Sequence, residues 1–84
     1  MSYEVLVLRR AQRQLARLPS RDYQRTRDLI LALGETPRPY GCLKLTNRPG
    51  WRIRDGDYRV IYEIDDNLQN ITVMDIGHRR DIYS

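Results

Sequence analysis

The sequence is poor in several residue types that particular functions need. Its 84 residues include one cysteine, one histidine and no phenylalanine. A single cysteine, Cys42, excludes an intramolecular disulfide and a zinc site built from cysteines. The single histidine, His78, lies between a glycine and two arginines, which is a poor setting for the buried, oriented base of a Ser-His-Asp triad. Walker and GxGxxG motifs are absent as well, so we expect neither a nucleotide cofactor nor a bound metal.

Long apolar runs are also missing. No stretch approaches the roughly 18 residues that a membrane-spanning helix needs, and the N-terminus lacks the charged start and apolar centre of a signal peptide. We therefore expect a cytoplasmic protein with no membrane partner. Chains divide into two domains only at roughly twice this length or more, so residues 1–84 are expected to form a single domain.

Lysine is scarce, because Lys44 is the only one among 15 basic residues. The net charge is +4, and residues 9–59 carry a larger surplus of +8, whereas acidic residues predominate in residues 61–84. The basic stretch is therefore the candidate contact surface for an anionic partner. The planar fork of arginine suits bidentate phosphate contacts, although a genome rich in arginine codons would also raise the ratio of arginine to lysine.

The first half of the chain predicts a strand followed by two helices. Residues 3–8 alternate loosely between apolar and polar side chains, which indicates a strand. In residues 9–18 the apolar positions recur at spacings of three and four, which predicts an amphipathic helix that Pro19 ends. Ser20 is expected to be the N-cap of a second helix, and Gly34 its C′ residue. So short a connection predicts an antiparallel helix hairpin.

The second half predicts an antiparallel meander. Residues 35–50 indicate an ordered connection with a short extended piece at 43–45. From Trp51 the period changes to two, which predicts strands at 51–54, 58–64 and 71–76 with a hairpin turn at Asp55-Gly56. The expected fold is α+β, with an N-terminal strand, an antiparallel helix hairpin and a three-stranded meander, and with both helices on one face of a single sheet.

The hairpin places several arginines on one face of the sheet. If Asp55-Gly56 is a two-residue loop, Arg52 pairs with Arg59, and Arg54 shares their face. Like charges opposite one another destabilise a strand pair, so an anion or an acidic neighbour such as Asp57 is needed to relieve them. A merely solvated face is the alternative, and a loop longer by one residue would move Arg59 to the other side.

The C-terminal residues 77–84 can extend this arginine face. If they fold across the edge of the sheet, they bring Arg79 or Arg80 and Tyr83 towards it. A frayed terminus is the alternative, although Ile82 and Tyr83 are unfavourable side chains to leave in water.

Three segments resemble the RelE/ParE toxins of bacterial toxin-antitoxin pairs. They are WRIRDGDYRVIYEI at 51–64, IGHRRDIY at 76–83 and PRPYGCLKL at 37–45. The opening strand and helix hairpin are similar to that family too, so the resemblance covers nearly the whole chain. It is greatest to the RelE branch, whose members cut messenger RNA in the ribosomal A site.

The resemblance implies a RelE-like fold, a ribosome-dependent endoribonuclease activity and a cognate antitoxin partner besides the ribosome and mRNA. The family's catalytic positions correspond to Arg52, Arg54, Arg59, Arg79 and Tyr83. We also expect RNA-binding roles for Lys44, Arg48 and Arg80. The best-known members have lysine at positions 52 and 54, and because arginine keeps its proton, a lysine-type general base at position 52 is excluded here.

Two other functions remain open at this point. Members of the ParE branch share the fold and inhibit DNA gyrase, and a non-catalytic nucleic-acid-binding module would use the same arginines for phosphate contacts alone. The combination of Arg79 and Tyr83 favours the RelE branch. Without an evident histidine pair or carboxylate base, the isolated protein should be a poor ribonuclease, and the ribosome is expected to position the substrate.

Overall fold

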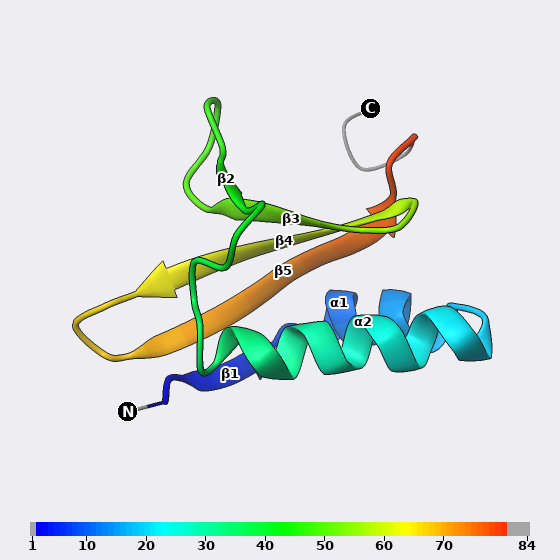
Figure 1. Cartoon of the computed structure of the whole chain (residues 1–84), viewed down its shortest axis with the longest axis horizontal. Helices are drawn as coiled ribbons and strands as arrows, with labels where there is room; N and C mark the ends of the chain where they lie inside the picture. The colour runs from blue at the N-terminus through cyan, green and yellow to red at the C-terminus, as the bar shows by residue number, and fades with distance from the viewer. Residues whose placement is uncertain (1, 81–84) are drawn as a thin grey trace.

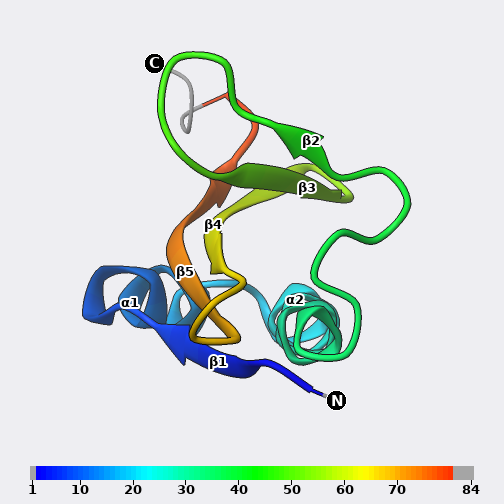
Figure 2. The same ribbon diagram turned by 90° about the vertical axis from the view of Figure 1, so that its left-hand side faces the viewer.

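A five-stranded mixed sheet forms the centre of the computed structural model, which describes residues 2–80. Its strands are β1 (Glu4–Val7), β2 (Leu43–Lys44), β3 (Trp51–Asp55), β4 (Tyr58–Asp65) and β5 (Asn70–His78), in the order β1-β5-β4-β3-β2. The helices α1 (Arg9–Ala16) and α2 (Ser20–Leu33) lie against one side of this sheet (Figures 1 and 2). The expected α+β fold with a meander of β3, β4 and β5 is confirmed.

The sheet contains two pairings beyond the meander. β1 pairs in parallel with β5, and β2 pairs antiparallel with β3. The extended piece expected at 43–45 is thus a two-residue edge strand, and so short an edge offers little template for pairing with another chain. β1 covers only the first residues of β5, so the remaining edge of β5 needs another partner.

Helix α1 provides that partner. The amide of Gln14 accepts a hydrogen bond from the backbone N–H of Ile76 at 2.7 Å and donates one to Asp75 at 2.7 Å. The side chain of Gln14 thereby satisfies an edge group of β5 that a strand would otherwise bond. This contact fixes α1 beside β5, directly after β1 ends.

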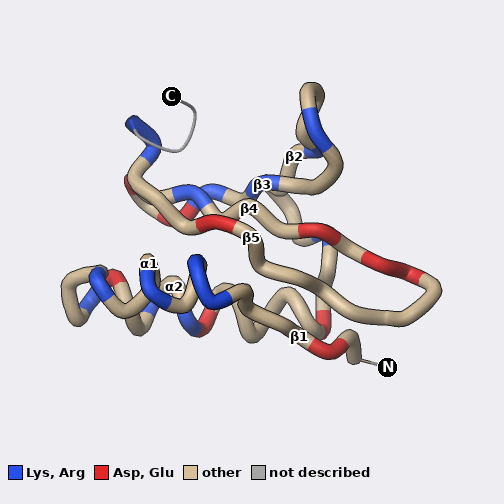
Figure 3. Tube along the Cα trace, turned by 180° about the vertical axis from the view of Figure 1, so that it is seen from behind, with Lys and Arg blue, Asp and Glu red and all other residues tan. Residues whose placement is uncertain are grey.

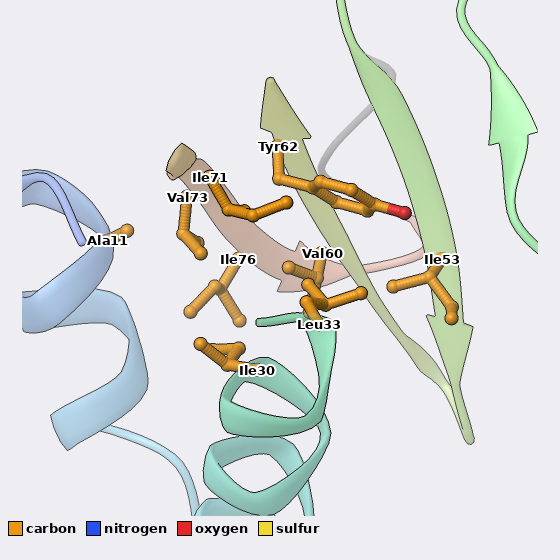
Figure 4. Packing of buried hydrophobic residues seen from close by; sticks show 9 residues of the cluster. All are labelled: Ala11, Ile30, Leu33, Ile53, Val60, Tyr62, Ile71, Val73 and Ile76. Atoms are coloured by element: carbon orange, nitrogen blue, oxygen red, sulfur yellow. The ribbon is translucent and has the colours of Figure 1, made fainter. Parts of the chain in front are cut away.

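The core lies between the helices and the sheet. Nine buried apolar residues form it, with the helices contributing Ala11, Ile30 and Leu33 and the strands β3, β4 and β5 contributing the rest (Figure 4). Tyr62 is fully buried among them, and its hydroxyl donates to the carbonyl of Pro37 at 2.9 Å. Burial raises the pKa of this phenol, so Tyr62 remains neutral and serves to hold the loop after α2.

The helix boundaries differ slightly from the expected ones. Ser20 is the first residue of α2 and Pro19 occupies the N-cap position, so the N-cap prediction for Ser20 is wrong. Gly34 has a right-handed conformation rather than that of a left-handed C′ residue. A Cβ at Gly34 would lie 2.9 Å from the backbone oxygen of Tyr3, so close approach of the chain before β1 is what requires glycine here.

The register of the β3–β4 hairpin also differs from the prediction. Asp55 pairs with Tyr58 and Arg54 with Arg59, so the two-residue loop is Gly56-Asp57 rather than Asp55-Gly56. Of these two loop residues only Gly56 has a positive φ, of 62°, and glycine in the first loop position is typical of a type II′ turn. Because the register moves by two residues, the side chains of residues 51–54 and 58–64 keep their expected faces, whereas Asp55 joins β3 and Asp57 lies in the loop rather than on the arginine face.

Candidate phosphate-binding face

The side of the sheet that faces away from the helices carries Arg52, Arg54 and Arg59. Ile53 and Val60 pair across β3 and β4 and are buried in the core. Side chains alternate along a strand, so the residues beside them lie on the opposite face. The predicted common face of the three arginines is confirmed, and we call it the arginine face.

Arg54 and Arg59 are direct cross-strand partners on the arginine face. The predicted pairing of Arg52 with Arg59 is therefore wrong. Arg59 itself is nearly buried, because only 9% of it is accessible. One terminal nitrogen of Arg59 donates to the carbonyl of Tyr58 at 3.2 Å, while its buried Nε has no hydrogen-bond partner. The fold thus holds a nearly buried guanidinium beside a second, exposed one.

Carboxylates do not neutralise this pair within residues 2–80. Neither Arg54 nor Arg59 forms an ion pair there. Asp75 is already engaged by Gln14 and by Arg10, whose guanidinium lies 3.3 Å away. Glu63 shares the arginine face but is four residues from Arg59 along β4, roughly 13 Å. Within the described part of the chain, this pair therefore lacks a neutralising anion.

A cavity of about 470 Å³ adjoins the arginine face. Arg52 lines it from β3, Lys44 from β2 and Arg48 from the loop that joins these strands. Three residues proposed from the sequence therefore surround one hollow. The ammonium of Lys44 also lies 5.4 Å from the centre of the Trp51 ring.

The residues after β5 continue towards the tip of the β3–β4 hairpin. The backbone N–H of Arg79 donates to the carbonyl of Asp57 at 2.8 Å, and both Arg79 and Arg80 are exposed. Gly77 is the cross-strand partner of Arg59, and Arg79 comes two residues after it. Tyr83 lies outside the described residues.

Neither His78 nor Tyr58 belongs to the arginine face. They are cross-strand partners on the side of the sheet that faces the helices, where their rings pack edge to face with centres 5.7 Å apart. His78 accepts a hydrogen bond from the backbone of Arg80 through Nδ1. The only histidine of the chain is therefore not placed to exchange protons with a substrate on the arginine face.

The sequence did not reveal the buried carboxylate of Asp55. It receives hydrogen bonds from the Thr26 hydroxyl and from Nε of Arg25, the latter at 2.7 Å, so two residues of α2 hold the end of β3. Asp55 and Thr26 are both buried. Asp55 follows Trp51 and Ile53 at the strand period of two, which is the signal that places it on the inner face rather than in the turn.

A second polar cluster holds the loop after α2. Arg38 forms a two-nitrogen contact with the carboxylate of Asp66, and the Tyr3 hydroxyl donates to the same carboxylate at 2.7 Å. The Arg38 guanidinium and the Tyr3 hydroxyl lower the pKa of Asp66, so this contact persists at neutral pH. The Arg38 guanidinium also lies 5.2 Å from the centre of the Trp51 ring, which the Lys44 ammonium contacts as well.

The charges are distributed unevenly in space as well as in sequence. Basic positions gather on α1, on β3 and beside β2, while acidic positions mark β4 and its turn to β5 (Figure 3).

Within residues 2–80 no three His, Cys, Asp or Glu side chains are placed to hold a metal ion. None of the helices in the described part has the length and apolar character needed to cross a membrane.

Comparison with protein families gives a match over residues 5–83. The matching family is described as the ParE toxin of the type II toxin-antitoxin system parDE. The comparison with curated protein sequences yields no significant match.

Solved structures with the same fold include toxins of several species. The toxin-antitoxin complex RelBE2 of Mycobacterium tuberculosis has 26% identity and a TM-score of 0.83, and the match covers 94% of this chain and 100% of that one. The archaeal RelE-RelB complex of Pyrococcus horikoshii has 28% identity and a TM-score of 0.83, with 96% and 99% covered. A YoeB/ParE toxin of Agrobacterium tumefaciens, at 18% identity and a TM-score of 0.75 over 89% and 96%, shares the fold.

The family match spans nearly the whole chain, and the overall fold agrees with these structures. The chain therefore belongs to the RelE/ParE family and is a toxin of a type II toxin-antitoxin system.

Proposed function

We propose that this toxin is a ribosome-dependent endoribonuclease that acts in the cytoplasm and cuts messenger RNA in the ribosomal A site. The observation that carries the proposal is the pair of Arg54 and Arg59, held opposite one another without a carboxylate partner in residues 2–80. Opposed cations are unfavourable in a strand pair, and a phosphate placed against them relieves the repulsion. If the arginine face served only to contact solvent, there would be no reason for Arg59 to be nine-tenths buried.

The proposed reaction is an internal transfer at one phosphate. The 2′-oxygen of the ribose loses its proton and bonds to phosphorus, the bond from phosphorus to the 5′-oxygen breaks, and that oxygen takes up a proton. Negative charge grows on the non-bridging oxygens in the transition state. Arg52, Arg54 and Arg59 would donate hydrogen bonds to these oxygens, where such donors act most strongly.

The two proton transfers need groups besides these arginines, because guanidinium does not release its proton at neutral pH. His78 and Tyr62 are excluded by their positions on the inner side of the sheet. We assign Arg79 to the leaving-group side and Tyr83 to base stacking or proton transfer. The remaining contribution, the alignment of the 2′-oxygen with the phosphate, would come from the ribosome.

The RNA strand would leave the arginine face through the cavity beside β2. Lys44 and Arg48 line this cavity together with Arg52, so they can contact phosphates next to the one that is cut. Arg80 is exposed beyond β5 and would contact the strand on the other side. Contacts of this kind position RNA without reading its sequence.

A cognate antitoxin is the second proposed partner, supported by relatives that were crystallised as toxin-antitoxin complexes. Between α2 and β3 the toxin has a further cavity of about 300 Å³, with Leu29, Pro39 and Ile53 in its lining. Tyr40 borders the same cavity and is fully exposed. An antitoxin segment with apolar anchors and acidic flanks fits both this cavity and the basic charge of the toxin.

The alternative is inhibition of DNA gyrase, and it is favoured by the family match, which carries the name of the ParE toxins. A non-catalytic nucleic-acid-binding module is a further alternative, since phosphate contacts alone would also relieve the repulsion between Arg54 and Arg59. The two main functions leave different traces in a cell. One yields cut messenger RNA, and the other yields changes in DNA supercoiling with intact messages.

Induction of the toxin in a bacterium, followed by mapping of messenger RNA 5′ ends, should reveal new ends confined to translated reading frames. Coexpression of the antitoxin should remove both the new ends and the growth arrest. As a control, the Arg54→Ala variant should produce few such ends at the same toxin level. Growth arrest with relaxed plasmid DNA and no new ends would instead identify gyrase as the target.

A further inference from the structure

Helix α1 carries a second basic surface, separate from the arginine face. Four arginines are exposed on it or at its end, Arg9, Arg10, Arg13 and Arg17, and only Ala11 of the helix is fully buried. Arg9, Arg13 and Arg17 follow one another at intervals of four, so they lie along one side over roughly 12 Å. We call these three residues the α1 arginine row.

The α1 arginine row is electrostatically unfavourable for the helix itself. No acidic residue occurs in α1, and arginines occupy its first turn, where the helix dipole favours negative charge. Like charges four residues apart repel one another. Within residues 2–80 none of the three arginines forms an ion pair, whereas Arg10 reaches Asp75.

In helix α2, by contrast, two of the three arginines have acidic partners. Arg25 contacts Asp22 and Asp55, and Arg27 lies 3.7 Å from Asp28. The lack of acidic partners along a whole row of arginines therefore distinguishes α1 from α2.

The contact of α1 with β5 places its arginines beside the arginine face. Asp75 belongs to the cross-strand row that runs through Ile61 to Arg52, and Arg10 contacts Asp75 from α1. Helix α1 lies next to β5, and β4, which carries Arg59, is the neighbour of β5 in the sheet (Figure 3). A substrate strand on the arginine face would thus have α1 at its side.

We propose that the α1 arginine row binds the phosphate backbone of a double-helical RNA segment next to the cleaved strand. This rests on the proposed function, because the ribosome supplies such RNA. The exposed residues between positions 9 and 17 are arginine, glutamine and alanine, whereas the centre of a protein interface is typically apolar. Phosphate contacts need only positive charge, so RNA fits this surface better than an acidic polypeptide does.

The test compares two double variants with equal loss of charge. R13Q/R17Q removes two members of the row, and glutamine keeps a good helix propensity. R21Q/R27Q removes two exposed arginines of α2 and is the matched control. Each protein is assayed for binding to a double-stranded RNA of about 20 base pairs and to programmed ribosomes over a range of salt concentrations, and its urea midpoint is measured.

We expect R13Q/R17Q to bind both the RNA duplex and ribosomes more weakly, by about 10-fold or more. The slope of the logarithm of the binding constant against the logarithm of the salt concentration should be smaller by about one to two. The cleavage rate at saturating ribosomes should be unchanged, because the row does not touch the scissile phosphate. R21Q/R27Q should bind like the unmodified toxin.

Equal binding by R13Q/R17Q and the unmodified toxin would overturn the proposal, as would an equal loss in R21Q/R27Q. Weakened binding to polyglutamate with unchanged binding to the RNA duplex would overturn it in favour of a protein partner. The duplex assay does not depend on cleavage. If the toxin fails to cut messenger RNA but the α1 arginine row still binds duplex RNA, the proposed function is wrong and the assignment of RNA binding to the row is supported.

Discussion

Replacement of Arg59 by leucine should lower the cleavage rate on ribosomes by about two to three orders of magnitude while the fold remains at least as stable. Arg59 is nine-tenths buried, faces Arg54 and has an unpartnered Nε, so the folded state bears the cost of an uncompensated cation. An apolar side chain removes that cost and should stabilise the toxin by about 1 kcal/mol or more. Cleavage rate and urea midpoint are measured on the same preparation.

Two further variants separate charge from geometry at this position. Arg59→Lys keeps the positive charge but loses the planar fork, so its rate should fall between those of the unmodified toxin and Arg59→Leu. Arg27→Gln, on the exposed surface of α2, should change neither measurement. If Arg59→Leu destabilised the toxin and left cleavage per folded molecule unchanged, Arg59 would be a structural residue only.

Replacement of Asp55 by alanine should destabilise the toxin by about 2–3 kcal/mol. The Thr26 hydroxyl is completely buried and donates to Asp55, so the variant leaves a buried donor without an acceptor. It also releases the Arg25 guanidinium, although that side chain is partly exposed and contributes less. For a domain of this size the melting temperature should fall by about 10 °C or more.

Asp57 is the matched control for Asp55. It is exposed in the hairpin loop two residues away, and Asp57→Ala should change stability by no more than about 0.5 kcal/mol. The Asp55→Asn variant retains an acceptor for the Thr26 hydroxyl, so its stability should lie between those of the Asp55→Ala and Asp57→Ala variants. Equal stability of the Asp55→Ala and Asp57→Ala variants would contradict the assignment of Asp55 as the contact that fixes β3 to α2.

The faces of the strands could be predicted from the sequence because they depend only on the period of two. Ile53 and Val60 lie inside, and Arg52, Arg54 and Arg59 lie on the other side, as expected. The register could not be predicted in the same way. Asp55-Gly56 and Gly56-Asp57 are both acceptable two-residue loops, and contacts of Asp55 with α2, 29 and 30 residues away in sequence, decide between them.

Long-range contacts also explain the other differences. The parallel pairing of β1 with β5 joins segments at opposite ends of the chain, and local patterns carry no information on it. The burial of Arg59 follows from its place in β4, between β3 and β5. The candidate site residues themselves were named from the sequence, and the structure adds how they are grouped: Lys44, Arg48 and Arg52 around a cavity, and Arg54 opposite Arg59.

Dependence on the ribosome can be measured as the rate at which purified toxin cuts one messenger RNA in two forms, free and bound to programmed ribosomes with an empty A site. Within residues 2–80 the arginine face holds no histidine, and no carboxylate there pairs with Arg54 or Arg59. We therefore expect a single cut in the A-site codon on ribosomes and almost no cleavage of the free RNA at the same toxin concentration. Equal cleavage of the free RNA, or none on ribosomes, would contradict it.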